Sequence, residues 1–234
     1  MTFILTSLVD IIMTLTPVIP YFAQVNTFNQ NKSSKGFSIK ISLFILSANI
    51  LRIFFWFGER FNISLLFQSV LMIIAQLYLV KVYVEYSEKN IYAKKDNFLR
   101  DFWDWDKDTN YFLFITTFIL FFISLSFNLG MENKLYVNFL GSLSSFLEAI
   151  MPCAQILKIY NEKSAKNFSY VLISSWVLGD SFKVYYYFTT NVPIQMLLSA
   201  IMQVVFDFVI VFQIIYYNNN ETEETDHKID GKIE

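Results

Sequence analysis

We expect five ionisable side chains to lie deep within long apolar stretches of this sequence. They are Arg52, Glu148, Asp180, Lys183 and Asp207, and the amide of Asn49 lies in similar surroundings. A lone charge at the centre of a membrane-spanning helix costs about 2.5–3.5 kcal/mol, so such residues face one another or a wet cavity and mark substrate or proton paths. We expect the six residues to line a substrate path. Ion pairing that serves only the structure is the alternative.

The spacing of these residues predicts how they pair. Asp180 and Lys183 are three positions apart, which places them on one face of a helix and predicts an ion pair between them. Arg52 has Asn49 in the corresponding position, so its counter-ion has to come from another helix. We expect Glu148 or Asp207 to supply it.

Few other residues offer catalytic or metal-binding chemistry. The chain has one histidine, His227, which makes a His-based metal site improbable, and one cysteine, Cys153, which excludes an internal disulfide. No serine has a neighbouring base, and there is no glycine-rich phosphate loop or paired-carboxylate hydrolase pattern. We therefore expect no enzyme activity, no cofactor and no metal. The net charge of −2 argues against a nucleic-acid partner.

The elements that carry the charged residues have the composition of membrane spans. Of the 234 residues, 55% are hydrophobic and 16% are charged, whereas a soluble domain carries about a quarter charged residues. A transmembrane helix needs roughly 20 apolar residues. Windows of about this length predict an all-α multipass membrane protein with seven transmembrane helices, at 4–26, 37–57, 62–84, 110–128, 136–157, 168–188 and 193–217.

Basic residues predict the orientation, because cytosolic loops are enriched in Lys and Arg. The C-terminal side of the membrane, with the connections after the first, third and fifth spans, carries fourteen of the 18 basic residues. The opposite side carries only Arg60 and Lys134. We therefore expect a lumenal N-terminus and a cytosolic C-terminus. The fourteen residues are Lys32, Lys35, Lys40, Lys81, Lys89, Lys94, Lys95, Arg100, Lys107, Lys158, Lys163, Lys166, Lys228 and Lys232.

Proline residues predict hinges in the first and fifth spans. Pro17 and Pro20 lie in the first span, and Pro152 lies in the fifth. Each proline removes a helical hydrogen bond and permits a bend. Gln24 and Gln155 follow these prolines within a few residues and could continue a polar seam. Kinks needed only for packing are the alternative to functional hinges.

Two segments outside the spans are distinctive in composition. The segment 98–106 interleaves aromatic and charged residues, as expected of a chain that lies at the lipid headgroups. We expect Phe102, Trp103 and Trp105 to anchor the fourth span there, with lipid handling or partner docking as the alternative. The tail at 218–234 is acidic, and we expect it to be disordered.

The chain contains an internal repeat. Gln24 aligns with Gln155, and the pair Asn49 and Arg52 aligns with Asp180 and Lys183. The repeat predicts two three-helix units, at 1–84 and 136–217, joined by residues 85–135, which hold a linker and the fourth span. Because three spans reverse the direction of the chain, the fourth span makes the two units parallel. Substrate paths in such folds run between the repeats.

These features resemble the PQ-loop repeat family. The resemblance covers nearly the whole chain and rests on Gly36-Phe37-Ser38, on the run at 48–58 that ends in Trp56-Phe57-Gly58, on Phe102-Trp103-Asp104-Trp105 and on Gly179-Asp180-Ser181-Phe182-Lys183. The sequence looks most similar to the endosomal and Golgi branch of the solute carrier 66 group, the PQ-loop repeat-containing protein 1 type. It departs from the family at the Pro-Gln pair, which is Ala23-Gln24 in the first repeat and Ala154-Gln155 in the second.

The resemblance implies three functions. The first is phospholipid translocation of the scramblase type between the leaflets of endosome or trans-Golgi membranes, in support of endosome-to-Golgi retrograde transport. The second is proton-coupled export of a small polar solute, as in the cystine exporters of the family, which is also related to the sugar-exporting SWEETs. The third is a non-transporting receptor or scaffold, since the KDEL receptor shares this architecture. Membrane lipids, or a solute and protons, would be the partners.

Overall fold

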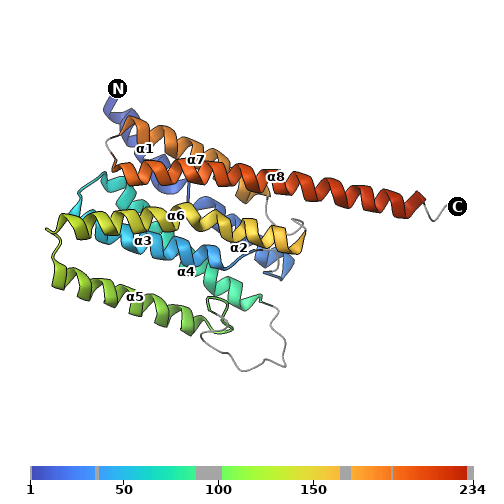
Figure 1. The fold of residues 1–234 in the computed structure, drawn as a ribbon, viewed down its shortest axis with the longest axis horizontal. Helices are drawn as coiled ribbons and strands as arrows, with labels where there is room; N and C mark the ends of the chain where they lie inside the picture. Colours follow the sequence, from blue (N-terminus) through green and yellow to red (C-terminus); the bar gives the residue numbers. More distant parts are fainter. Residues whose placement is uncertain (1, 35–36, 88–101, 164–169, 191, 231–234) are drawn as a thin grey trace.

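The computed structural model describes residues 2–34, 37–87, 102–163, 170–190 and 192–230, and every regular element within them is an α-helix (Figure 1). The helices are α1 (Thr2–Leu15), α2 (Ile19–Asn31), α3 (Lys40–Gly58), α4 (Ile63–Glu85), α5 (Asp108–Leu129), α6 (Lys134–Glu162), α7 (Tyr170–Thr189) and α8 (Ile194–Asp230). The predicted all-α fold is confirmed.

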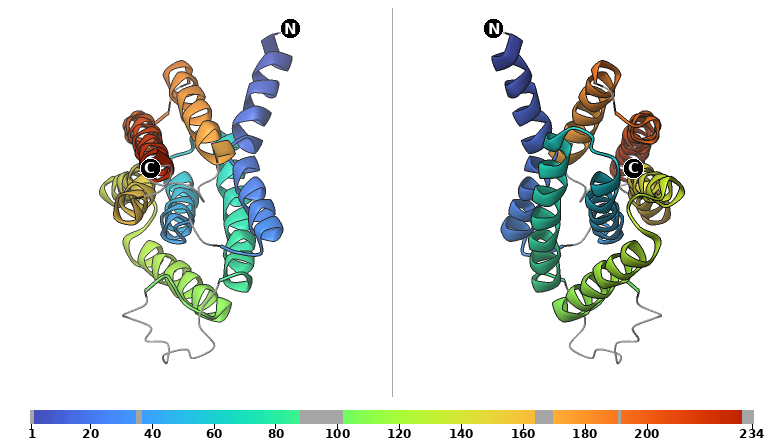
Figure 2. Two further views of the ribbon diagram at one scale, coloured as in Figure 1. Left: turned by 90° about the vertical axis from the view of Figure 1, so that its right-hand side faces the viewer. Right: turned by 90° about the vertical axis from the view of Figure 1, so that its left-hand side faces the viewer.

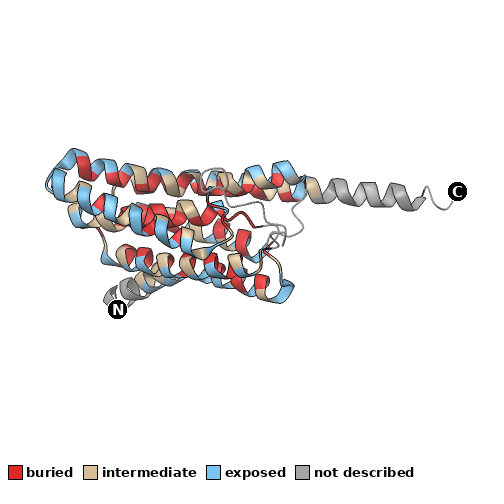
Figure 3. Cartoon of the chain, turned by 90° about the horizontal axis from the view of Figure 1, so that it is seen from below, coloured by how far each residue is buried: buried red, intermediate tan, exposed pale blue. Residues whose placement is uncertain are grey.

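Five helices are long and apolar enough to cross a membrane, namely α3, α4, α5, α6 and α8. Helix α7 has 20 residues but carries Asp180 and Lys183 within it. Helices α1 and α2 have 14 and 13 residues, so neither crosses a membrane alone. Exposed residues line the outer faces of the helices (Figure 3), and many are large and apolar, such as Phe127 and Leu135. The chain is a multipass membrane protein, and the number seven stays a prediction.

The first predicted span is two helices rather than one. Helix α1 ends at Leu15 and α2 begins at Ile19, with Pro17 between them. Because Pro17 has no backbone N–H, the helical ladder is interrupted, and the N–H of Val18 donates to the carbonyl of Leu15, three residues back, at 3.1 Å. Pro20 lies in the first turn of α2, where proline is tolerated. The predicted hinge is a full break.

The second predicted hinge leaves its helix intact. Helix α6 runs from Lys134 to Glu162 with Pro152 inside it, and so extends beyond the predicted span 136–157 at both ends. The single backbone N–H that proline lacks is tolerated when neighbouring helices enclose that part of the helix. Pro152 is buried, as this explanation requires. The two halves therefore differ in how their prolines act.

Asparagine side chains begin two of the helices. Asn62 accepts a hydrogen bond from the backbone N–H of Ser64 at the start of α4, and Asn133 does the same for Leu135 and Tyr136 at the start of α6. Such caps satisfy backbone donors that have no partner inside the helix. At the end of α5, Gly130 has a φ of 76°, a conformation that glycine adopts without a steric penalty.

Both halves of the chain pack their helices in the same order. Helix α4 contacts α1, α2 and α3, and helix α8 contacts α6 and α7, so the third helix of each half touches the other helices of that half. The halves meet where α3 packs on α6 and where α2 packs on α7. These two interfaces are equivalent under the predicted repeat. Helix α5 lies on the outside of the bundle against α3 and α4 (Figure 2).

The aromatic segment before α5 packs against protein through Trp103 and Trp105, and its location at the lipid headgroups stays a prediction. Both indole rings are fully buried, whereas Phe102 is 39% exposed. The Trp103 ring N–H donates to the carbonyl of Ile39 at 3.1 Å, and the hydroxyl of Tyr111 accepts from the backbone N–H of Trp105 at 3.0 Å. These bonds and the packing of the rings on one another fix the segment against the start of α3.

The C-terminal helix is longer than predicted. Helix α8 continues to Asp230, where the sequence predicted a span ending at 217 and a disordered tail. Residues 218–230 contain no glycine or proline, and the first helix-breaking residue is Gly231. Some of the residues behind other predictions lie outside the described ranges, namely Lys35, Gly36, Lys89, Lys94, Lys95, Arg100, Lys166 and Lys232.

Candidate substrate site

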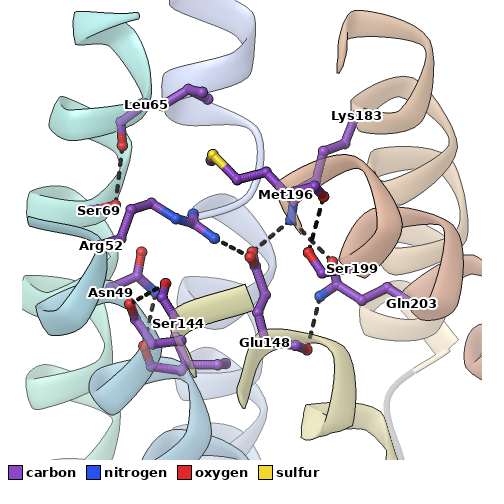
Figure 4. A network of polar contacts seen from close by, with 12 residues as sticks. Asn49, Arg52, Leu65, Ser69, Ser144, Glu148, Lys183, Met196, Ser199 and Gln203 are labelled. Carbon is purple, nitrogen blue, oxygen red and sulfur yellow. Dashed lines mark hydrogen bonds and ion pairs between the residues drawn. The ribbon is translucent and has the colours of Figure 1, made fainter. Parts of the chain in front are cut away.

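Glu148 on α6 joins the two halves of the bundle through its carboxylate (Figure 4). One carboxylate oxygen accepts a hydrogen bond from Arg52 Nη2 on α3, and the other accepts one from Lys183 Nζ on α7 at 2.5 Å. Gln203 on α8 completes the arrangement, because its Oε1 accepts from Lys183 Nζ at 3.0 Å and its Nε2 donates to the backbone carbonyl of Glu148 at 3.2 Å. One half-buried anion thus holds two buried cations.

The prediction for Arg52 is confirmed, and the prediction for Lys183 is wrong. Arg52 takes its counter-ion from another helix, and that counter-ion is Glu148. Lys183 also pairs with Glu148 rather than with Asp180 on its own helix. The ammonium group reaches across to α6 because a carboxylate and the Gln203 amide together satisfy it there. Asp180 forms no ion pair with any residue that the structure describes.

A cavity lies beside this network, between the two halves of the bundle. It offers about 70 Å³ to the centres of water molecules, which is room for several of them. Its walls come from the α1–α2 break and from α3, α4, α6, α7 and α8. The polar residues in the wall are Thr16, Asn49, Gln68, Glu148, Ser175, Asp180, Lys183 and Gln203.

The structure brings most of the predicted site residues together. Asn49, Glu148, Asp180 and Lys183 line the cavity, and so do the prolines Pro17 and Pro20. Arg52 and Asp207 are buried beside the cavity. Each interacts with a residue of the cavity wall, Arg52 with Glu148 and Asp207 with Asp180. Gln24, Pro152 and Gln155 are buried in the bundle but do not line the cavity. The aromatic residues Phe102, Trp103 and Trp105 belong to a separate cluster.

A second polar cluster joins the two halves at the end of the bundle where α4 and α6 begin. Asp10 on α1 accepts hydrogen bonds from the hydroxyl of Tyr186 on α7 at 2.8 Å and from the amide of Asn62 at 3.2 Å. The Asn62 amide also donates to the Tyr186 hydroxyl at 2.7 Å. Asp10 is not among the site residues predicted from the sequence. An acidic residue inside the first apolar stretch was the signal that could have found this cluster.

Comparison with known proteins is consistent with this architecture. Residues 136–196, which run from α6 into α8, match the family model described as PQ loop repeat. The chain is 26% identical to Scramblase ANY1 of Saccharomyces cerevisiae, over an alignment that covers 88% of this chain and 69% of that protein. The resemblance to the PQ-loop repeat family that the sequence predicted is therefore confirmed for residues 136–196, which match the PQ loop repeat.

Proposed function

We propose that this protein translocates phospholipids between membrane leaflets as a scramblase-type transporter, without enzymatic chemistry. The similarity to Scramblase ANY1 supports this reading. The observation that carries it is the unequal packing of the two interfaces between the halves, which the predicted repeat makes equivalent. One interface is closed, and the other contains the polar cavity.

The interface between α3 and α6 is closed by small residues. A Cβ atom added at Gly141 on α6 would lie 2.7 Å from the Phe55 ring of α3, and one added at Gly58 on α3 would overlap Val137 on α6. The hydroxyl of Ser144 donates to the Ala48 carbonyl across the same interface at 2.8 Å. Backbones this close leave no space for a substrate.

The interface on the side of α2 and α7 is loosely packed. Residues on both sides of the α1–α2 break face the cavity opposite α7, which contributes Trp176, Gly179 and Asp180 to its wall. A Cβ atom added at Gly179 would meet nothing within 4 Å. Figure 2 shows α1 diverging from α7 on this side of the bundle.

A lipid translocator needs this combination of features. The polar headgroup has to cross a region where an unsolvated charge costs several kcal/mol, while the acyl chains stay in hydrocarbon. We infer that the cavity gives the headgroup a polar route and that separation of α2 from α7 opens this route sideways to the acyl chains. Resemblance to the endosomal and Golgi branch suggests endosome or trans-Golgi membranes and a role in retrograde transport. Localisation of a fluorescently tagged chain tests the compartment.

The direct test uses purified protein in liposomes that contain a trace of phosphatidylcholine labelled on one acyl chain with the fluorophore NBD. Dithionite, which does not cross the bilayer, destroys the fluorophore in the outer leaflet. If the protein moves lipids, fluorescence is expected to fall well below the inner-leaflet fraction in vesicles that contain it. Fluorescence that stops at the level of protein-free vesicles would contradict the proposal.

A variant at Gly179 tests whether the cavity is the route. Gly179→Leu places a side chain in open space, so it is expected to narrow the cavity without unfolding the helix. Lipid movement should slow by about tenfold, the change that 1.4 kcal/mol in a barrier produces. Leu178→Phe is the matched control, because Leu178 is the preceding residue and is 72% exposed. Equal rates for the two variants would place the route elsewhere.

Solute export is the second candidate function. It is favoured by the Asp10, Asn62 and Tyr186 cluster, which joins α1 to α7 beyond one end of the cavity and could close it on that side. The same liposomes test this candidate when a pH gradient is imposed across their membrane and radiolabelled cystine or lysine is added outside. Uptake that depends on the gradient, without any lipid movement, would favour export over lipid translocation.

A further inference from the structure

The residues in and beside the cavity carry more negative charge than positive charge. Both cations, Arg52 and Lys183, are held by Glu148. Asp180 and Asp207 form no ion pair with any described residue. With all five groups ionised, three carboxylates face two cations. The third negative charge has to be neutralised, either by a proton that Asp180 and Asp207 share or by a cation that enters the cavity.

The two unpaired acids lie next to each other. Asp180 is in the cavity wall, and Asp207 on α8 interacts with it from a fully buried position. Neither carboxylate oxygen of Asp207 has a hydrogen-bond partner among the described residues. Their repulsion is relieved when a cation enters the cavity beside Asp180. The position beside Asp180, where a positive charge would balance the two acids, is therefore accessible from the cavity.

An independent feature on α4 points to the same space. Gln68 lines the cavity opposite α7 and is only 3% exposed. Its Oε1 is buried and accepts no hydrogen bond from any described residue. A buried acceptor without a partner costs about 1–3 kcal/mol, unless a ligand supplies the partner. The amide oxygen, like the carboxylates, is complementary to a positively charged group.

Aromatic side chains complete the wall. Trp176 on α7 and Tyr21 on α2 both line the cavity. Aromatic faces attract ammonium groups, and quaternary ammonium groups are bound in this way because they have no N–H to donate. The cation already present, Lys183, is occupied by Glu148 at 2.5 Å and by Gln203 at 3.0 Å. Lys183 therefore makes no direct ion pair with Asp180, so the position for a cation beside Asp180 is left to another group.

We propose that this cavity binds the cationic ammonium group of phospholipid headgroups, as found in choline and ethanolamine lipids, between Asp180, Gln68, Trp176 and Tyr21. The inference rests on the proposed lipid translocation and names the headgroup class that the site prefers. Free choline carries the same cation, so the shared chemistry is the ammonium group and the test has to separate its two sources.

The test compares two acyl-labelled NBD lipids in liposomes, phosphatidylcholine, which carries the cation, and phosphatidylglycerol, which does not. The wild-type protein is expected to move phosphatidylcholine about tenfold faster, the ratio that 1.4 kcal/mol produces. Asp180→Asn should remove most of this preference by slowing phosphatidylcholine alone. Glu132→Gln is the control, because it removes one negative charge from an exposed residue outside the cavity. Equal wild-type rates for the two lipids would overturn the proposal.

Binding separates this inference from the proposed function. Isothermal titration of the purified protein uses dihexanoyl phosphatidylcholine, dihexanoyl phosphatidylglycerol and choline chloride as probes. Saturable binding of the two choline compounds without lipid movement would support the cation site and contradict translocation. Lipid movement without a binding preference for the choline compounds would do the reverse. Choline binding without binding of the choline lipid would identify a free solute as the source of the cation and would overturn the headgroup assignment.

The proposal stays testable if Asp180→Asn does not fold, because the preference of the wild-type protein is measured without it. Gln68→Leu provides a second variant, which removes the unpartnered oxygen while keeping a similar volume. It is expected to weaken binding of dihexanoyl phosphatidylcholine several-fold and to leave the weak binding of dihexanoyl phosphatidylglycerol unchanged. Unchanged choline-lipid binding in folded Gln68→Leu would remove Gln68 from the site and overturn the proposed set of contacts.

Discussion

Glu148 is the residue on which the central network depends, because it is the shared partner of two buried cations from different halves of the chain. Removing one member of a buried ion pair typically costs about 3–5 kcal/mol, since the other charge is left uncompensated. The effect of a substitution therefore depends on how many charges it leaves without a partner. Removing Glu148 leaves two cations without a partner, whereas removing Lys183 leaves none, because Glu148 keeps Arg52.

We expect Glu148→Gln to destabilise the protein more than Lys183→Met does. The first change leaves both Arg52 and Lys183 without a counter-ion, whereas the second leaves Glu148 paired with Arg52. Thermal stability in detergent, followed by size-exclusion chromatography of heated samples, measures the difference. Glu132→Gln controls for the loss of a carboxylate, because Glu132 is exposed. A melting temperature for Lys183→Met at or below that of Glu148→Gln would contradict this ranking.

Tyr186 gives a second prediction, in the cluster at the other polar contact between the halves. Tyr186→Phe removes the hydroxyl that donates to Asp10 and accepts from Asn62. A hydrogen bond to a charged group contributes about 1.5–3 kcal/mol, so a clear loss of thermal stability is expected. Tyr185→Phe is the matched control, because Tyr185 is the preceding residue and is 66% exposed. Equal melting temperatures for the two variants would show that the cluster adds no stability.

The sequence predicted the members of the central site better than their pairing. Burial of a charge in an apolar stretch identified Arg52, Glu148 and Lys183, and the lack of an acid near Arg52 on its own helix required a partner from another one. Helical spacing placed Asp180 and Lys183 on one face, but it says nothing about a stronger acceptor on a neighbouring helix. The pair of Lys183 with Glu148 depends on where α6 and α7 lie relative to each other in the bundle, which spacing within one helix does not determine.

At the scale of helices, apolar length predicted where the elements are, and local chemistry decided where they end. The sequence located every helix, yet it joined α1 to α2, because it treated Pro17 as a bend rather than a break. It also did not predict that the Trp103 ring N–H reaches the Ile39 carbonyl, because composition alone does not reveal such a contact. Contacts between residues far apart in the sequence account for such differences.

The contrast between two glycines tests the unequal packing of the helices. Gly141→Ala is expected to destabilise the protein by about 1–3 kcal/mol, because the new methyl group would overlap the Phe55 ring at the α3–α6 interface. Gly179→Ala should be neutral or stabilising, because it meets no atom within 4 Å and removes a glycine from a helix, which is worth up to about 1 kcal/mol. Thermal unfolding of both variants in detergent measures the difference. A larger loss at Gly179 would contradict the assignment of the closed interface.

At the scale of the whole molecule, the two halves share one packing order but differ where they meet. Arg52 and Lys183, which the repeat makes equivalent, approach the same carboxylate from α3 and α7. Glu148 is on α6 only, and the aligned position in the first half is Pro17, in the break between α1 and α2. The difference places a charged residue of α6 in the cavity wall and a break between two helices at the equivalent position of the first half. This asymmetry is one basis for the polar route that we propose along one side of the bundle.

The orientation of the molecule gives the last prediction, which uses the two ends of α5. This helix has 22 residues, about 33 Å at 1.5 Å per residue, so residues just beyond its ends lie on opposite sides of a bilayer. Lys107 and Glu132 are both exposed there, Lys107 on the predicted cytosolic side and Glu132 on the predicted lumenal side. In a Cys153→Ser background, a membrane-impermeant maleimide added from the cytosol should label Lys107→Cys at once and Glu132→Cys only after permeabilisation. The reverse pattern would invert the topology, and the excess of basic residues would then lie on the lumenal side, against the enrichment of Lys and Arg in cytosolic loops.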